Sequence, residues 1–421
     1  MTNPAHQQFT DPARSRSHSR PSLLARTDAA LAPWQWWLAF AFLAVAVVDQ
    51  ALANTRSGID FAVFVRAARR IVAGEDLYQL ADGHYAFKYL PPAALAFVPL
   101  ALLPERVAWA AWNLLSAIAL VRLMRFSAEA RRPAPGVLGH LLVLLLMMPF
   151  YAHLFFLGQC DAVLLGLAVE SERRAERQPG LSGALLAAAM LAKPPFALVG
   201  LLALARRQGR RLWVAAATGL GLLALPVLRY GVAGELEQLR AWRALLASST
   251  PGLLCDPQNQ SVFAVACTYL ATPAEAARSA ASAAVLGLAA TAAVAAAGWA
   301  IARTDKALGA FVAFAGALWL VAFLSPLGWR TNLLGMIPLF YLALALARRG
   351  ATRALRWSAG VVLAAQLAVG ELAPRLLPKA IAGRLLEHRH FALAAAALAL
   401  VILAATTRDV ALQARGTAPR S

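Results

Sequence analysis

Long apolar runs, separated by short polar segments, recur along the whole chain. Arginines cluster in alternate segments between the runs, as in cytoplasmic loops that follow the positive-inside rule. Most runs are long enough to cross a bilayer as helices, in which the backbone satisfies its own hydrogen bonds. The pattern therefore predicts an all-α polytopic membrane protein. The expected spans are 34–53, 105–123, 137–156, a short return to 173, 212–229, 280–302, 308–324, 333–347, 357–373 and 391–406.

One apolar run, 181–205, has basic clusters near both ends. A single crossing would place one of these clusters outside the membrane. Lys193-Pro194-Pro195 lies in the middle of the run, and two prolines break a helix. We therefore expect two half-helices that return both flanks to the cytoplasm. Counting these, the chain should have about 10–12 transmembrane helices with both termini inside.

The first outer loop follows the first span and is expected to hold two interfacial elements. Residues 60–72 place apolar side chains on one helical stripe, which is typical of an amphipathic helix lying at the membrane surface. Residues 91–103 are apolar but too short to span, and prolines bracket them. We interpret this second segment as interfacial or re-entrant.

The chain divides into a membrane domain and two tails. Residues 1–33 are polar and rich in Arg and Ser, which predicts a disordered cytoplasmic tail. The membrane domain is expected over 34–407, and a second cytoplasmic tail over 408–421. The largest later outer loop is expected at 230–278. The outer segment 374–390 is anomalous because it is basic, so either the topology differs there or its cations face phosphates.

Composition supports the membrane assignment. Of the 421 residues 60% are hydrophobic and 14% are charged, whereas soluble proteins have about 25% charged residues. The net charge of +19 would suit a nucleic-acid-binding protein, but the positive residues lie between apolar runs. We therefore expect no nucleic-acid partner and assign these residues to topology and anionic lipid.

The three cysteines show no metal-ligand spacing, and we expect no metal and no cofactor. Cys255 and Cys267 could pair on an outer surface, but separate roles as apolar fillers are favoured.

Seven short motifs follow one another in a characteristic order. They are Asp60; Gly74-x-x-Leu77-Tyr78; Tyr89-Leu90-Pro91-Pro92 with Pro99-Leu100 and Leu103-Pro104; Gly158-Gln159; Ala192-Lys193-Pro194; Asn259-Gln260-Ser261; and Ser325-Pro326-Leu327-Gly328-Trp329. In this order the sequence resembles glycosyltransferase family 87 over about residues 35–350. No single motif is specific, so the resemblance rests on their order.

The resemblance implies a GT-C helix bundle with its site on the outer face. It further implies a polyprenyl-phosphate sugar donor, mannose by default, and Asp60 as the catalytic carboxylate. Chemistry supports this role, because a carboxylate can accept the proton of an acceptor hydroxyl as the glycosidic bond forms. A single displacement inverts the anomeric centre. Alternatively, Asp60 caps the interfacial helix; rival carboxylates are Asp49, Glu75, Asp76 and Asp82.

The donor phosphate requires cations, and three are candidates. Lys193 lies at a helix break within an apolar run, where an ionisable residue usually lines a cavity or is paired; the alternative is a lysine that snorkels. Arg330 follows Trp329 where the family often has histidines, and His153 is another possible replacement. Lys88 could also contact phosphate, although lipid headgroups would explain it equally well.

Sugar and acceptor contacts are expected from aromatic and amide side chains. Tyr89 and Trp329 could pack on the sugar ring, or belong to an interfacial aromatic belt. Gln159, Asn259 and Gln260 would hydrogen-bond hydroxyls, although Gln159 could instead join helices. Asp161 stands where the family has Asn, which bears on the donor's identity.

The predicted function is that of a polyprenyl-phosphate-sugar-dependent hexosyltransferase in a bacterial inner membrane. It would act on a lipid or glycan acceptor at the periplasmic face. A transporter or flippase of a lipid-linked sugar is the alternative, because broken helices are also typical of transporters. A third possibility is a catalytically silent scaffold. Either alternative would leave Asp60 without a catalytic role.

Overall fold

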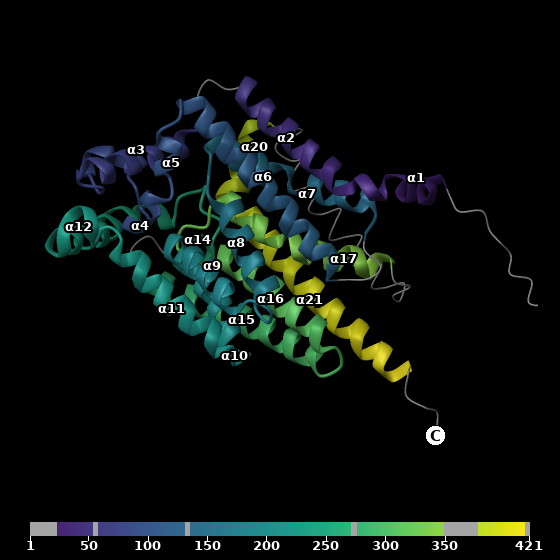
Figure 1. The fold of residues 1–421 in the computed structure, drawn as a ribbon. Coiled ribbons are helices and arrows are strands. Elements are labelled where there is room, and N and C mark those ends of the chain that lie inside the picture. Colours follow the sequence, from purple (N-terminus) through teal and green to yellow (C-terminus); the bar gives the residue numbers. More distant parts are fainter. Residues whose placement is uncertain (1–22, 54–57, 131–134, 271–275, 349–377, 417–421) are drawn as a thin grey trace, which may run out of the picture.

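A computed structural model describes residues 23–53, 58–130, 135–270, 276–348 and 378–416. Helices and connecting loops make up these ranges, with no β-strand among them, so the predicted all-α polytopic fold is confirmed. Within them, six helices are long and apolar enough to cross a membrane, or seven if one bent pair forms a single span. Figure 1 shows their arrangement. Five of the six are α6 (Glu105–Glu129), α7 (Val137–Leu157), α15 (Ala276–Ala302), α16 (Lys306–Phe323) and α21 (His390–Gly416), and the sixth runs through α2 (Gln35–Ala53).

Shorter helices account for part of the difference from the expected 10–12 crossings. They include α8 (Asp161–Arg174), α9 (Pro179–Ala192), α10 (Ala197–Ala205) and α17 (Ile337–Arg348). The span expected at 357–373 lies outside the described residues.

The predicted break at Lys193 is confirmed. Helix α9 ends at Ala192, a 3-10 turn occupies Pro194–Phe196, and α10 follows. Arg206, just after α10, and Arg211, in α11 (Gly209–Ala224), both pair with Glu172 near the end of α8. Both flanks of the break therefore lie at the same end of the bundle as the end of α8, as the charge pattern requires.

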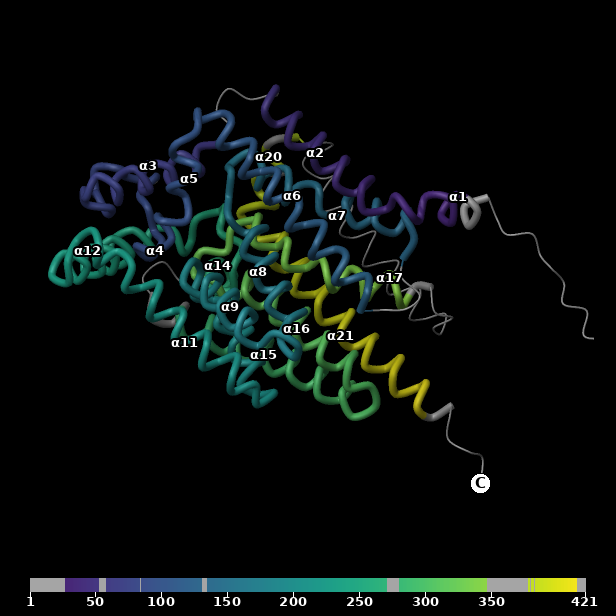
Figure 2. Tube along the Cα trace, viewed as in Figure 1, coloured from purple at the N-terminus to yellow at the C-terminus, as the bar shows by residue number. Residues whose placement is uncertain are grey.

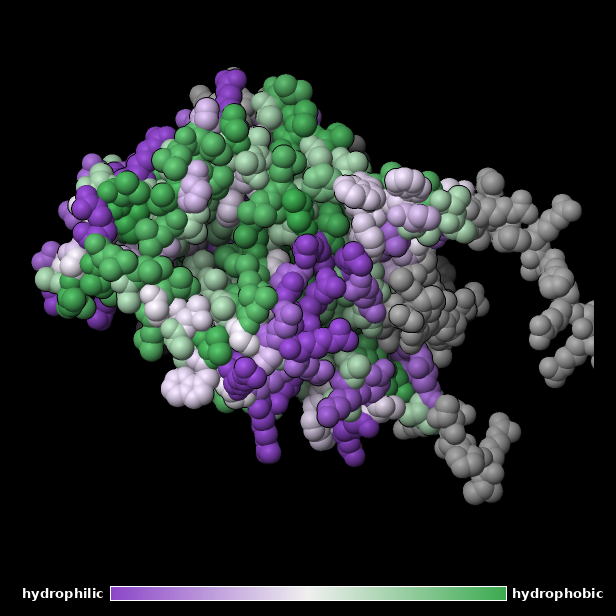
Figure 3. All heavy atoms as spheres, in the orientation of Figure 1, coloured by the Kyte–Doolittle hydropathy of each residue, from purple (hydrophilic) through white to green (hydrophobic). Residues whose placement is uncertain are grey.

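The arginine-rich end of the bundle is visible on the surface. Figure 3 shows hydrophilic side chains gathered over the lower end of α6, while hydrophobic ones cover much of the rest of this face. Ion pairs join α6 to α8 at this end, including Arg122 with Glu170 at 2.9 Å. We designate this the basic end and the opposite one the cavity end.

The cavity end is built largely from interfacial elements. The amphipathic helix predicted at 60–72 is confirmed as α3 (Ile59–Ala73), and the 91–103 segment forms the short helices α4 (Pro91–Leu95) and α5 (Val98–Ala101). Figures 1 and 2 show α3 and α12 (Val227–Ser249) beside each other at one edge of the molecule.

The described part of the 230–278 segment, expected as an outer loop, is mostly helical. Helix α12 turns 91° from α11, and α13 (Pro251–Leu254) and α14 (Val262–Tyr269) follow. Its polar side chains bind the 72–89 segment: Arg229 donates to the carbonyls of Val72 and Ala73, and Trp242 to that of Lys88 at 3.0 Å. These hydrogen bonds join residues that are distant in sequence, and they hold α12 against the 72–89 segment.

Helices extend into the described parts of both predicted tails. Leu23–Leu31 forms α1, so the part of the 1–33 segment that begins at Leu23 is helical; residues 1–22 lie outside the described ranges. Helix α21 continues to Gly416 without a break at 407. In both cases the helical backbone continues beyond the apolar run, because each residue added to an existing helix gains one intrahelical hydrogen bond.

The basic segment at 374–390 is explained in part by Arg389, which is buried at the start of α21. Its guanidinium donates to the carbonyls of Cys255 and Asp256 and to the Thr268 hydroxyl. This arginine therefore binds protein backbone at the cavity end rather than a phosphate. Helix α20 (Lys379–Glu387) precedes it.

Glu172→Gln should destabilise the fold strongly. Arg211 is 1% exposed and its paired carboxylate is Glu172, so the substitution leaves a buried charge without compensation. We expect a loss of about 3–5 kcal/mol, measured as a lower midpoint of thermal unfolding in detergent. Glu129→Gln, which removes a half-exposed surface pair with Arg125, is the matched control and should change the midpoint little. Equal effects of the two substitutions would contradict the role of the buried pair.

Candidate active site

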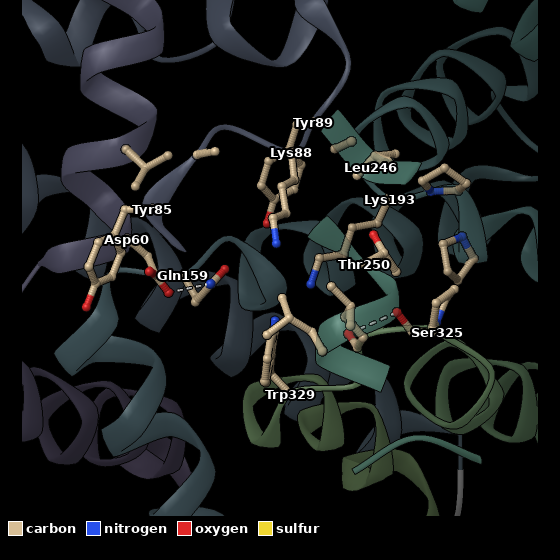
Figure 4. A pocket seen from close by; sticks show the side chains of 18 of the residues that line it. Asp60, Tyr85, Lys88, Tyr89, Gln159, Lys193, Leu246, Thr250, Ser325 and Trp329 are labelled. Atoms are coloured by element: carbon tan, nitrogen blue, oxygen red, sulfur yellow. Dashed lines mark hydrogen bonds between the residues drawn. The ribbon is translucent and has the colours of Figure 1, made fainter. Parts of the chain in front are cut away.

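A cavity of about 950 Å³ lies at the cavity end, between α3, the 85–89 segment, the Lys193 break, α12 and the Ser325–Arg330 loop. It contains seven of the nine predicted site residues, which come from segments far apart in the sequence. They are Asp60, Lys88, Tyr89, Gln159, Lys193, Trp329 and Arg330. Figure 4 shows Lys88 and Lys193 pointing toward a shared central space, with Asp60 and Gln159 on one side and Trp329 below.

Two glycine turns bring Asp60 against Gln159. Gly58 begins α3 with a φ of 88°, and its N–H donates to the Phe156 carbonyl at 2.7 Å. Gly158 ends α7 with a φ of 71°, and a Cβ there would lie 2.6 Å from the Cβ of Phe61. Side chains larger than glycine would therefore hold the two turns apart.

The Gln159 amide donates a hydrogen bond of 2.6 Å to the Asp60 carboxylate. This bond fixes the position of one carboxylate oxygen at the cavity wall. Asp60 lies in the first turn of α3, where the partial positive charge of the helix N-terminus interacts favourably with a carboxylate. An ionised carboxylate in this position can accept a proton.

The rival carboxylates lie elsewhere. Asp82 pairs with Arg70 at 2.5 Å, and the Asp76 carboxylate accepts a hydrogen bond from Gln238. Asp49 is exposed and binds the neighbouring Gln50. Among the described residues that line the cavity, Asp60 is the sole carboxylate.

Cations outnumber this carboxylate around the cavity. Lys88, Lys193, Arg243 and Arg330 all line it. Lys193 pairs with Asp161 and also donates to the Asn332 side chain. For Lys88, Arg243 and Arg330 the described residues supply no ion-pair partner, and the buried Nε atom of Arg330 has no hydrogen-bond partner. Burial lowers the pKa of Lys88 from its ordinary value, so an anion bound beside this ammonium would restore its preference for the charged form.

Aromatic side chains form much of the remaining wall. Tyr89 and Trp329 both line the cavity, and so do Tyr85 and Trp242. The Tyr89 hydroxyl accepts a hydrogen bond from the Cys160 thiol. Burial, followed by the nearby Cys160 and Asp161, raises the pKa of Tyr89. The phenol therefore stays protonated and retains a hydrogen that it can donate.

Sequence reasoning missed Trp242 and Arg243 because it assigned their segment to a loop. The available signal was the apolar and polar alternation of 227–249 at helical spacing, which would have predicted a second interfacial helix. His153, considered as a replacement for a family histidine, also lines the cavity.

The expected sugar contacts of Asn259 and Gln260 do not fit their positions. Neither residue lines the cavity, and both are almost fully buried. Asn259 donates to the carbonyls of Leu253, Leu254 and Pro326, and its oxygen accepts from the N–H groups of Ser261 and Gly328. The Gln260 side chain donates to Pro257 and accepts from Ala392. Both side chains therefore support the cavity wall from behind.

A disulfide supports the same wall. Cys255 and Cys267 are bonded, with their Cα atoms 5.7 Å apart, so the favoured interpretation of these cysteines as separate apolar fillers is wrong. The bond closes the loop that follows Leu253 and Leu254, two residues of the cavity wall. Proximity in the fold, which the spacing of the cysteines alone does not reveal, decides this pairing.

The sequence matches the model of glycosyltransferase family 87 over residues 87–326, more than half of the chain. The chain belongs to glycosyltransferase family 87. No curated protein and no solved structure was found to match it. The family establishes a membrane glycosyltransferase, and the matched region includes every predicted site residue from Lys88 to Gln260. Asp60, Trp329 and Arg330 lie outside it, so their assignment depends on the cavity.

Asn259→Ala should lower stability, because five hydrogen bonds to the backbone depend on this amide. With several buried backbone groups left unsatisfied, a loss of about 2–4 kcal/mol is expected, read as a lower thermal midpoint. Gln258→Ala, at an exposed neighbour, is the control and should leave the midpoint unchanged. An unchanged midpoint in Asn259→Ala would contradict the supporting role.

Proposed function

We propose that this glycosyltransferase transfers a sugar from a polyprenyl-phosphate donor to a hydroxyl of a lipid or glycan acceptor. Mannose is the default sugar. The observation that carries the proposal is the charge distribution of the cavity, where one carboxylate faces four cations. A lipid phosphate is an anion that such cations can stabilise as it leaves.

The cavity suggests a division of roles. Asp60, held by Gln159, would accept the proton of the acceptor hydroxyl as its oxygen bonds to the anomeric carbon. The bond between that carbon and the phosphate oxygen would break, and its electron pair would leave with the phosphate. Lys193, Arg330 and Lys88 would hold this anion, and no metal is needed in the scheme. One displacement inverts the centre, so a β-linked donor would give an α-linked product.

Tyr89 and Trp329 would contact the sugar. Their aromatic rings line the same cavity as Asp60 and Lys193, and the Tyr89 hydroxyl can donate to a sugar oxygen. Family membership favours this enzymatic function over a flippase for a lipid-linked sugar. The flippase alternative predicts movement of labelled lipid across the bilayer without consumption of donor.

Asp60→Asn should abolish transfer while preserving the hydrogen bond to Gln159 through the remaining oxygen. We expect at least a ~100-fold loss of turnover, the size expected for removal of a general base. The assay measures release of polyprenyl phosphate by purified protein in nanodiscs, from a panel of radiolabelled polyprenyl-phosphate sugars and with membrane-lipid acceptors present.

Asp49→Asn is the matched control and should retain wild-type turnover, since Asp49 lies outside the cavity lining. Turnover that survives in Asp60→Asn would remove Asp60 from the mechanism. Transport of labelled lipid without donor consumption would support the flippase instead.

The disulfide favours a cavity that opens to the periplasmic face of a bacterial inner membrane, because disulfides persist in oxidising compartments. In intact spheroplasts carrying Cys160→Ala, an impermeant reductant followed by an impermeant maleimide should therefore label Cys255 and Cys267. Samples without reductant are the control and should stay unlabelled. Labelling that requires permeabilised membranes would place this end of the protein in the cytoplasm.

A further inference from the structure

Asp161 lies directly behind the cavity wall and is almost fully buried. One of its carboxylate oxygens accepts from the Lys193 ammonium. The other accepts from the Thr331 hydroxyl at 2.5 Å. Asp161 thus joins three segments that are distant in sequence: the start of α8, the break between α9 and α10, and the turn that follows Trp329.

Lys193 retains one donor for the cavity. An ammonium has three N–H donors, and Asp161 and the Asn332 side chain accept two of them, the latter at 3.2 Å. Lys193 also lines the cavity. The Asp161 carboxylate opposes the lysine charge, whereas Lys88 and Arg330 have no such counter-charge among the described residues.

The position of Asp161 also connects the two sides of the site. It follows Gln159 by two residues, and Gln159 donates to Asp60. Between them, Cys160 contributes the thiol that donates to the Tyr89 hydroxyl. A displacement of the 158–161 turn would therefore move the Asp60 side and the Lys193 side of the cavity together.

We infer that Asp161 is a positioning residue that holds Lys193 at the cavity wall and, by compensating its charge, limits how tightly the cavity retains a phosphate. This inference rests on the proposed function. A glycosyltransferase with a lipid-phosphate leaving group must bind the anion in the transition state and then release it. Uniformly tight binding of the anion would slow product release without aiding the chemical step.

A stability cycle tests the pairing without an activity assay. Asp161→Asn leaves Lys193 without a counter-charge, Lys193→Met leaves Asp161 as an uncompensated buried carboxylate, and the double variant removes both charges. For a coupled buried pair, the double variant should be destabilised by less than the sum of the two single variants. Additive midpoint shifts would overturn the pairing.

Affinity for polyprenyl phosphate tests the functional part. Undecaprenyl phosphate, titrated into protein in nanodiscs, should bind Asp161→Asn on the order of tenfold more tightly than wild type, because one opposing charge has been removed. Lys193→Met should bind it more weakly. In turnover assays Asp161→Asn should show a lower kcat together with a lower KM and stronger inhibition by added undecaprenyl phosphate.

Glu172→Gln is the matched control, since it breaks a buried ion pair on the same helix but at the basic end. It should lower stability while leaving lipid-phosphate affinity unchanged. Unchanged or weaker affinity in Asp161→Asn, with normal binding by wild type, overturns the inference alone. A wild type that binds no polyprenyl phosphate overturns the proposed donor and, with it, the inference about affinity.

Discussion

The fold depends on an ion pair formed where two helix breaks meet. Helix α7 ends at Leu157 and α9 ends at Ala192, and both ends lie against the same cavity. Inside a membrane bundle, irregular backbone is tolerated only where protein or a cavity satisfies it. The ion pair between Asp161 and Lys193 joins these two breaks. The polar groups exposed at the breaks are thereby brought together at the cavity wall.

The opposite end of the bundle shows the same physical constraint. Glu172, near the end of α8, pairs with Arg206 and Arg211. Helix α8 therefore has a buried ion pair at each end, one beside the cavity and one among the basic loops. An intact buried ion pair adds little net stability, but an arrangement that separates the partners leaves a buried charge uncompensated and is strongly destabilised. These pairs therefore specify how α8, α9 and α11 meet.

The wall at the cavity end is assembled from several short elements. Helix α12 is held on the 72–89 segment by hydrogen bonds to backbone carbonyls. The loop after α13 is held by a disulfide, by Asn259 and by Arg389. These cross-links join loops and short helices that are distant in sequence into one cavity wall.

The sequence by itself determined the membrane class, most of the apolar helices, the break at Lys193 and the interfacial helix at Asp60. These follow from hydrophobic periodicity, proline chemistry and the distribution of arginines, all of which are local. Only the tertiary structure decided that α12 lies on the 72–89 segment and lines the cavity. It also decided that Asn259 and Gln260 support the wall and that Cys255 pairs with Cys267. Each of these features depends on a partner that is distant in sequence. The residues next to a polar side chain in the sequence do not show whether it will hydrogen-bond a substrate or the protein backbone.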